Sequence, residues 1–333
     1  MKFLVTGAAG FIGFHLCLKL LNNGHSVYGI DNLNNYYDVN LKKNRLKHLL
    51  QNKSFKFKKI DISDNNFVKK IYPSVKNIKI IIHLAAQAGV RYSIKHPYKY
   101  IKNNVEAQVS ILELAKKIKN FEHLFYASSA SVYGYNKKIP FAVTNRVDDP
   151  ASLYGATKRA GELISNSYSM MFKINCTGLR FFSVYGPWGR PDMAAYIFTK
   201  SLFKNKTIDL FNYGRMERDF TYIDDIIHGL KASINKNYPC EVFNLGNNNW
   251  EDLMDVISIL ENALGQKADI EFFGMQPGDV KKTFADIDHS RDKLSYRPLT
   301  SINEGIPNFI HWYRNYINKE GSLVNFTPAP KAV

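Results

Sequence analysis

A tyrosine and a lysine stand four residues apart in the run Tyr154-Gly155-Ala156-Thr157-Lys158. On a helix this spacing places both side chains on one face. A lysine ammonium close to a phenol favours the phenolate, so we expect Lys158 to lower the pKa of Tyr154. Such a tyrosine can take a proton from a sugar or alcohol hydroxyl while hydride leaves the same carbon. The pair therefore predicts Tyr154 as a base, with Lys158 beside it.

A glycine-rich turn near the N-terminus gives this pair its context. Gly7, Gly10 and Gly13 follow the first apolar run and open a helical pattern. Small residues permit a tight turn and a close approach of the backbone to a pyrophosphate at the helix N-terminus. A simple strand-to-helix turn is the alternative, but the later tyrosine–lysine pair favours a dinucleotide. The expected contacts in this segment are Gly7, Gly10, Phe11, Ile12 and Gly13.

Polar and small residues after the next strands extend the predicted cofactor site. Asp31 ends the second predicted strand, where a carboxylate binds the adenosine ribose hydroxyls and repels a 2′-phosphate. Because Asn32 follows it rather than an arginine, we expect NAD in preference to NADP. Helix N-capping is the alternative for Asp61, and a solvated polar position is the alternative for Asn103. The further cofactor contacts expected are Asn32, Asp61, Ile62, Leu84, Ala85, Ala86, Gln87 and Asn103.

A serine-rich segment, residues 128–131, ends the fifth predicted strand. A serine at the carboxyl edge of a sheet can hydrogen-bond the reacting hydroxyl and orient it toward Tyr154. Capping of the backbone at a strand end is the other explanation for these hydroxyls. At least one of the serines is expected to act in the site.

These residues need a frame that brings strand ends together. Short apolar runs alternate with helical patterns, which favours a doubly wound parallel sheet with ligands at the carboxyl ends of its strands. The predicted strands are Lys2–Thr6, Ser26–Asp31, Phe55–Ile60, Ile78–Leu84, His123–Ala127 and Asn175–Arg180. The predicted helices between them are Ile12–Asn22, Val39–Leu50, Asp64–Ile71, Pro97–Lys119 and Ser152–Phe172.

The order of elements is less regular after residue 180. Helices are predicted near Met193–Phe203, Asp224–Ile234, Asp252–Leu264 and Asn303–Tyr316, with short strands near Phe220–Tyr222 and Glu241–Asn244. We interpret residues 1–180 as a Rossmann domain of the α/β class. Residues 181–325 are then a smaller mixed lobe for the substrate, with Tyr222 and Asn244 as points where the chain could return to the main sheet. Residues 326–333 are expected to form a loose tail.

Composition excludes several classes of function. The chain has 333 residues, 45% of them hydrophobic, enough for a full core. Its three cysteines show no metal or disulfide spacing, and no signal peptide or membrane-length apolar run is seen, so a cytoplasmic protein without a metal site is expected. The net charge is +16, but lysines are scattered without a basic stripe, so we expect neither a nucleic-acid partner nor a membrane.

Longer segments carry a resemblance to a known family. They are residues 31–38, 85–91, 179–194 and 218–225, of which Leu179-Arg180-Phe181-Phe182-Ser183-Val184-Tyr185-Gly186-Pro187-Trp188-Gly189-Arg190 is the most specific part. With them, nearly the whole chain resembles an extended short-chain dehydrogenase/reductase. Within that group it resembles the nucleotide-sugar 4-epimerases, and the UDP-glucuronate 4-epimerases most closely.

The resemblance implies roles for individual residues. It makes Tyr154 the base, Lys158 a ligand of the nicotinamide ribose and Ser129 the catalytic hydroxyl. It places Phe181 at the nicotinamide, and Arg91 and Arg190 at the sugar carboxylate. Further substrate contacts implied are Ser131, Ser183, Arg215, Arg218 and Asp279. Ser183 keeps a hydroxyl where the glucuronate group has threonine. Thr283 matches a position where some galactose epimerases carry a bulky aromatic residue, so it leaves room for a larger substituent on the sugar.

The implied reaction is NAD-dependent conversion of UDP-glucuronate to UDP-galacturonate through a 4-keto intermediate, in a homodimer that serves polysaccharide biosynthesis. A UDP-glucose or UDP-GlcNAc 4-epimerase and a UDP-glucuronate decarboxylase are alternatives, as are a reductase that releases its cofactor and a non-catalytic NAD sensor. Ala130 and Ser131 stand where the related 4,6-dehydratases carry Asp-Glu, and Ser131 stands where the decarboxylases carry Glu. Both substitutions favour the epimerase.

Overall fold

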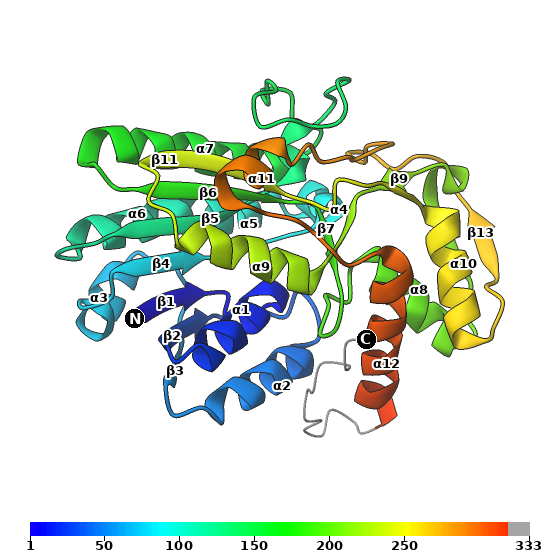
Figure 1. The fold of residues 1–333 in the computed structure, drawn as a ribbon, viewed down its shortest axis with the longest axis horizontal. Coiled ribbons are helices and arrows are strands. Elements are labelled where there is room, and N and C mark those ends of the chain that lie inside the picture. Colours follow the sequence, from blue (N-terminus) through cyan, green and yellow to red (C-terminus); the bar gives the residue numbers. More distant parts are fainter. Residues whose placement is uncertain (319–333) are drawn as a thin grey trace.

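The structure is a computed structural model that describes residues 1–318. Its centre is a seven-stranded parallel sheet in the order β11-β6-β5-β4-β1-β2-β3, on the left in Figure 1. The strands are β1 (Lys2–Thr6), β2 (Ser26–Asp31), β3 (Phe55–Lys59), β4 (Ile80–His83), β5 (His123–Ser129), β6 (Cys176–Phe181) and β11 (Cys240–Leu245). The predicted doubly wound parallel sheet is confirmed.

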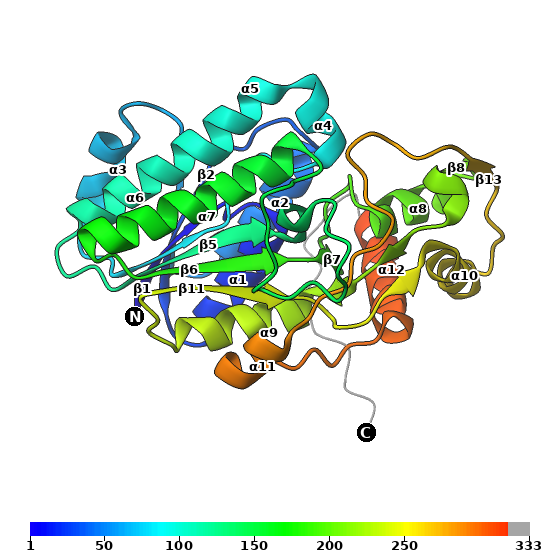
Figure 2. The ribbon, with the colours of Figure 1, turned by 90° about the horizontal axis from the view of Figure 1, so that it is seen from above.

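Helices cover both faces of this sheet (Figure 2). One face carries α1 (Phe11–Asn22), α2 (Val39–Leu50), α9 (Ile223–Ile234) and α11 (Asp288–Leu294). The other face carries α3 (Phe67–Val75), α6 (Ala107–Lys117) and α7 (Leu153–Phe172). α7 begins where the Ser152 hydroxyl accepts a hydrogen bond from the Gly155 amide, and it ends at Lys173, whose φ is 57°. The helix with the tyrosine–lysine pair is thus capped and held on the sheet.

Alternating side chains on the central strands fill two separate cores. Phe3 and Val5 of β1 belong to one buried cluster, whereas Leu4 between them belongs to the other. β4 repeats the pattern, because Ile82 and Ile81 lie in different clusters. Successive residues of a strand point to opposite faces, so these uninterrupted apolar runs produce a sheet that is buried on both sides.

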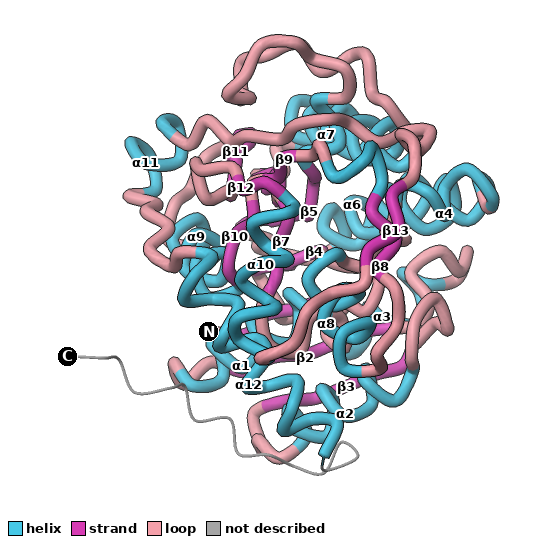
Figure 3. The backbone as a smooth tube through the Cα atoms, turned by 90° about the vertical axis from the view of Figure 1, so that its right-hand side faces the viewer, coloured by secondary structure: helices cyan, strands magenta, loops and turns pink. Residues whose placement is uncertain are grey.

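A second group of elements lies beyond the carboxyl ends of the strands, and Figure 3 looks onto it. Its helices are α8 (Ala194–Phe203), α10 (Leu253–Leu264) and α12 (Ile302–Asn318), with a short turn η3 (Phe211–Gly214). Two-stranded sheets join β7 (Ser183–Tyr185) to β10 (Phe220–Tyr222), β9 (Glu217–Arg218) to β12 (Glu251–Asp252), and β8 (Ile208–Leu210) to β13 (Ile270–Phe272). β10 was predicted, but the other short strands were not.

The second half of the chain also contributes to the main sheet. β11 pairs with β6, with Asn244 opposite Arg180, so the predicted return at Asn244 is confirmed. Tyr222 does not return, because β10 pairs only with β7 among the described residues. The division into units at residue 180 remains a prediction, and the predicted tail, 326–333, lies outside the described residues.

The helix predicted over Pro97–Lys119 is interrupted. The structure has α5 (Pro97–Tyr100), a π-helical turn η1 (Ile101–Glu106) and then α6. Within η1 the Asn104 amide donates to the Gln87 carbonyl and to the Thr157 hydroxyl, each at 3.0 Å, and its oxygen accepts from the Gln87 amide at 2.8 Å. The wider turn thus brings an asparagine into contact with a loop at the strand ends.

Other boundaries differ in small ways. The helix predicted over Asp64–Ile71 begins only at Phe67, because the Asp64 side chain accepts the Asn66 amide in a preceding turn. α4 (Val90–Lys95), η2 (Ala130–Tyr133) and α11 were not predicted. Within residues 1–318, no helix combines the length and apolar character needed to cross a bilayer.

Candidate active site

A cleft of about 950 Å³ opens at the carboxyl ends of the central strands, between the main sheet and the second group of elements. All but one of the predicted site residues line it; the exception is Arg215, which is exposed and lies outside the lining. The predicted residues in the lining are Gly7, Gly10, Phe11, Ile12, Gly13, Asp31, Asn32, Asp61, Ile62, Leu84, Ala85, Ala86, Gln87, Arg91, Asn103, Ser129, Ser131, Tyr154, Lys158, Phe181, Ser183, Arg190, Arg218 and Asp279.

The glycine turn leaves no space for side chains. Gly7 has φ +67°, and a Cβ there would lie 2.8 Å from the Ala85 nitrogen. A Cβ on Gly13 would collide with the Gly7 carbonyl oxygen. Gly10 caps α1 with its backbone alone, since no side chain caps this end. The result is a backbone cradle at a helix N-terminus, which fits a pyrophosphate.

The acidic residues next to this cradle are held by hydrogen bonds. Asp31 accepts the Leu33 amide at 2.8 Å and the Ala9 amide at 3.2 Å. Burial raises the pKa of Asp31, although these hydrogen bonds oppose the rise. Asp61 accepts Asn32 Nδ2 at 3.1 Å and the Ser63 hydroxyl at 2.7 Å. Burial would raise the pKa of Asp61, but the hydrogen bonds from Ser63 and Asn32 outweigh it and lower that pKa.

Tyr154, Lys158 and Ser129 all line the cleft. Tyr154 and Lys158 lie one turn apart on α7, and Ser129 ends β5. The Ser131 amide donates to Ser129 Oγ at 3.2 Å, and Lys158 Nζ donates to the Ala127 carbonyl at 2.9 Å. The candidate base, the ammonium and the serine hydroxyl thus come from α7 and β5 and line the same cleft.

The Arg190 guanidinium favours the phenolate of Tyr154, a role that the sequence did not suggest for it. Burial raises the pKa of Tyr154, while the Arg190 guanidinium and a hydrogen bond from Ser129 lower it. The expected effect of Lys158 on the pKa of Tyr154 remains a prediction, and in the structure the Lys158 ammonium donates to the Ala127 carbonyl. Burial and Arg190 lower the pKa of Lys158 to about 8, against the opposing charge of Glu162.

Arg190 belongs to a polar group that the sequence did not reveal. Its Nε and Nη2 donate to the two carboxylate oxygens of Asp192, at 3.0 and 2.5 Å. The Tyr36 hydroxyl donates to Asp192 Oδ2 at 2.9 Å. All three residues line the cleft. Tyr36 lies in the segment 31–38, which carries part of the family resemblance. This resemblance was the only feature of the sequence that could have pointed to Tyr36 as a site residue.

The remaining arginines have partners within the protein. Arg91 Nη2 lies 2.9 Å from Asp279 Oδ2, and its guanidinium stacks 4.0 Å from the centre of the Phe211 ring. Arg218 donates to the backbone carbonyls of residues 217, 280 and 281. Burial lowers the pKa of Arg218 to about 10.

Comparisons with known proteins agree with this arrangement. Residues 3–246 match the model of the NAD dependent epimerase/dehydratase family. UDP-glucuronate 4-epimerase 4 of Arabidopsis thaliana is 42% identical over 330 residues, which cover 94% of this chain and 75% of that protein. The predicted resemblance to the extended short-chain dehydrogenase/reductases and their nucleotide-sugar 4-epimerases is confirmed.

Solved structures are also similar. A UDP-glucuronic acid 4-epimerase from Bacillus cereus, crystallised with UDP-glucuronic acid and NAD, has a TM-score of 0.89 at 37% identity and covers 95% of this chain and 99% of that one. A UDP-glucose 4-epimerase from Thermotoga maritima, crystallised with UDP-glucose, has a TM-score of 0.86 at 29% identity, with 95% and 100% covered. With a family model over more than half of its length and these relatives, the chain belongs to the NAD dependent epimerase/dehydratase family.

Proposed function

We propose that this protein converts UDP-glucuronate to UDP-galacturonate, with NAD as its cofactor. One observation carries the proposal: Tyr154, Lys158 and Ser129 meet in the same cleft as the glycine cradle, with Arg190 near enough to act on the pKa of Tyr154. The similarity to UDP-glucuronate 4-epimerases at 42% and 37% identity supports the same reaction.

The residues at the strand ends fit NAD. We infer that Gly7, Gly10 and Gly13 accommodate its pyrophosphate and that Asp31 binds the adenosine ribose. When bound, NAD would supply the redox chemistry, because its nicotinamide can accept a hydride from carbon 4 of the sugar and return it. We infer that Phe181, at the end of β6, borders the nicotinamide, and that Lys158 holds its ribose.

Tyr154 moves the proton at the 4-hydroxyl. It accepts this proton while carbon 4 is oxidised, and Ser129 orients the hydroxyl by a hydrogen bond. The 4-keto sugar then presents its other face, and Tyr154 returns the proton as the ketone is reduced. Arg190 assists because its positive charge favours the phenolate. The nucleotide stays bound while the sugar turns, so binding energy from a remote part of the substrate serves the reaction.

The sugar end of the cleft supports a uronate. Among the described residues, Arg190 makes its hydrogen bonds to Asp192 through Nε and Nη2. This arrangement turns the Nη1 side of the guanidinium into a candidate donor for a sugar carboxylate. We infer that Arg218 and Asp279 serve the nucleotide end, and that Ser131 and Ser183 contact the sugar. Arg91 would reach substrate only by loosening its ion pair with Asp279.

A neutral-sugar 4-epimerase is the second candidate. The similarity to a UDP-glucose 4-epimerase at 29% identity favours it, although the identity is lower than for the glucuronate enzymes. Incubation of the pure protein with UDP-glucuronate, UDP-glucose and UDP-GlcNAc, with chromatographic separation of the products, tests both. We expect UDP-galacturonate as the main product. Turnover of UDP-glucose alone would move the assignment to the neutral sugar, and release of carbon dioxide would indicate a decarboxylase.

We also propose a cytoplasmic homodimer that supplies precursors for a polysaccharide. Apolar side chains are exposed on neighbouring helices: Tyr98 is 86%, Leu163 53% and Met170 69% exposed. A second copy packing α5, α6 and α7 against its own equivalents would cover them. Light scattering at micromolar concentration should therefore give twice the mass of the chain. A mass of one chain would reject the dimer.

A further inference from the structure

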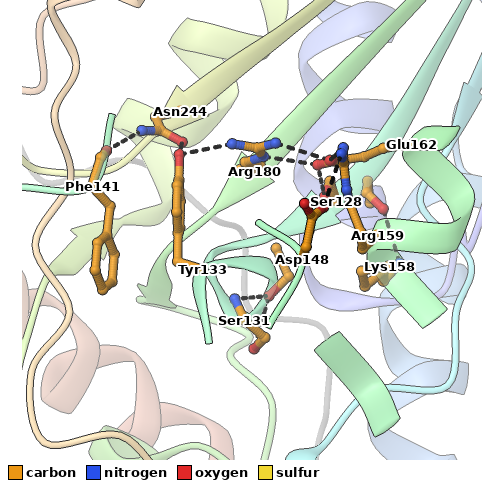
Figure 4. Close-up of polar contacts among 12 residues, drawn as sticks. Ser128, Ser131, Tyr133, Phe141, Asp148, Lys158, Arg159, Glu162, Arg180 and Asn244 are labelled. Carbon is orange, nitrogen blue, oxygen red and sulfur yellow. Dashed lines mark hydrogen bonds and ion pairs between the residues drawn. The ribbon is translucent and has the colours of Figure 1, made fainter. Parts of the chain in front are cut away.

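A buried ion pair lies behind the helix that carries Tyr154 and Lys158. Glu162 of α7 and Arg180 of β6 have side-chain exposures of 2% and 3%. Arg180 Nε donates to Glu162 Oε1 at 2.8 Å, and Arg180 Nη2 donates to Oε2 at 2.9 Å. Figure 4 shows the two side chains facing each other between the helix and the sheet. The pair is bidentate, which fixes both its distance and its orientation.

Further hydrogen bonds connect this pair to the surrounding strands and loops. The Ser128 hydroxyl donates to Glu162 Oε1 at 2.6 Å. Arg180 Nη1 donates to the Tyr133 hydroxyl at 3.0 Å, and this hydroxyl donates to Asn244 Oδ1 at 2.7 Å. Asn244 Nδ2 in turn donates to the carbonyl of Phe141 at 2.7 Å (Figure 4). It also donates to the carbonyl of residue 286 at 2.9 Å. One continuous buried network thus joins α7, β5, η2, β6 and β11.

Each end of this network is next to a reacting group. Glu162 lies one turn beyond Lys158 on α7. Ser128 directly precedes Ser129 at the end of β5. Tyr133 ends η2, the short helix that carries Ser131. The network therefore holds the helix with Tyr154 and Lys158 on one side and the segment with the serines on the other. The residues of the network do not themselves act on the substrate.

Stability alone does not account for this ion pair. Burial would raise the pKa of Glu162, but the hydrogen bond and charge of Arg180, with hydrogen bonds from Ser128 and Arg159, outweigh it and lower that pKa, so the carboxylate is ionised. A buried ion pair costs desolvation of both charges, and well-packed apolar residues often give equal or higher stability. What the pair adds is a defined geometry between a helix and a strand end.

We propose that Glu162 and Arg180 are positioning residues: their ion pair fixes α7 against the ends of β5 and β6 and so sets how Tyr154 and Lys158 stand relative to Ser129. The inference rests on the proposed function, because it takes these three side chains as the reacting groups. A displacement of about 1 Å between reacting groups can cost on the order of 100-fold in rate, so even a small loosening would slow the reaction.

The test uses single variants and a compensated double variant of the full-length protein. Glu162→Gln leaves the buried Arg180 charge without its carboxylate. Arg180→Met leaves the Glu162 carboxylate with only the partly exposed Arg159, whose Nη1 donates to Glu162 Oε2 at 3.1 Å, and Glu162→Gln/Arg180→Met removes both charges of the buried pair. For each variant, Tm, NAD affinity, kcat and KM for UDP-glucuronate are measured. We expect both single variants to lose Tm and at least tenfold in kcat, with KM and NAD affinity within about twofold of wild type. The double variant should regain Tm and keep the low kcat.

Asp225→Asn is the matched control. Asp225 is also buried, accepts the amides of Leu299 and Thr300 at 3.0 Å each, and lies outside the cleft. Asp225→Asn should lower Tm and leave kcat unchanged. If kcat recovers together with Tm in the double variant, or if kcat of the single variants equals that of wild type, the pair is merely structural and the proposal is overturned.

Tyr133→Phe keeps the test decisive if the charge variants do not fold. It removes only the hydroxyl that links Arg180 to Asn244. A kcat reduced several-fold at constant KM supports positioning, and an unchanged kcat contradicts it. Wild-type activity separates the two proposals. A wild type inactive on all three UDP-sugars overturns the proposed function and this inference with it, whereas an active wild type with equally active variants overturns this inference alone.

Discussion

The backbone shapes the cofactor side of the cleft, whereas paired charged side chains shape its sugar side. Around Gly7 and Gly13, added Cβ atoms would meet backbone atoms, so this surface cannot adjust. Around Arg190, the surface consists of an arginine and an aspartate of one loop and a tyrosine from a distant segment, joined by hydrogen bonds. The first kind of surface suits a cofactor that stays in place. The second suits a sugar that must turn and be recognised by its substituents.

The largest expected effect lies where the two sides meet. Tyr154→Phe removes the only proton-transferring atom of that side chain and leaves its shape. We expect kcat to fall by about 10²–10⁴-fold, with NAD and UDP-sugar affinities nearly unchanged. Steady-state kinetics together with calorimetric binding measure both. Wild-type-like turnover would show that the base is elsewhere.

On the cofactor side, the charge of Asp31 should separate NAD from NADP. A carboxylate next to a 2′-phosphate costs several kcal/mol when the two charges lie close together, so we expect wild type to bind NAD roughly 100-fold or more better. Thermal-shift titration with both dinucleotides measures the difference. Asp31→Ser should reduce the difference between the affinities for NAD and NADP. A preference of wild type for NADP would reject the assignment.

Breaking the glycine cradle should affect the cofactor side alone. Gly13→Ala places a Cβ against the Gly7 carbonyl oxygen. Overpacking of this kind costs about 1–3 kcal/mol, so NAD affinity should fall roughly 10- to 100-fold while UDP binding stays near wild type. Gly274→Ala is the control, because a Cβ there would meet nothing within 4 Å. Equal losses of NAD and UDP affinity would mean that the two sides are not separable.

The same contrast explains what could be predicted from the sequence. Gly7, Gly10, Gly13 and Asp31 act through local backbone geometry, so their spacing along the chain is enough to identify the turn and the strand end. The tyrosine–lysine pair is likewise a local pattern on one helix. Most strands and helices of the first half were predicted within a few residues for the same reason.

Contacts between distant segments could not be predicted from the sequence. Tyr36 and Asp192 are 156 residues apart in the chain, and no periodicity announces their hydrogen bond. Arg215 and Arg218 are three residues apart, yet only Arg218 lines the cleft, because the chain turns sharply through η3 just before them. The π-helical turn at Asn104 could not be predicted for another reason: the sequence keeps a helical pattern of apolar residues through it.

The sugar side offers the most direct test of the account, which holds that Arg190 recognises the carboxylate of a uronate. A charge-assisted hydrogen bond to a carboxylate is worth about 2 kcal/mol, so Arg190→Ala should lower kcat/KM for UDP-glucuronate by roughly 30-fold. Because Arg190 also lowers the pKa of Tyr154, some loss is expected for every sugar. The decisive quantity is therefore the ratio of kcat/KM for UDP-glucuronate to kcat/KM for UDP-glucose, measured for wild type and for Arg190→Ala. We predict that this ratio falls in the variant, whereas equal losses for the two sugars would contradict the carboxylate role and favour a neutral-sugar epimerase.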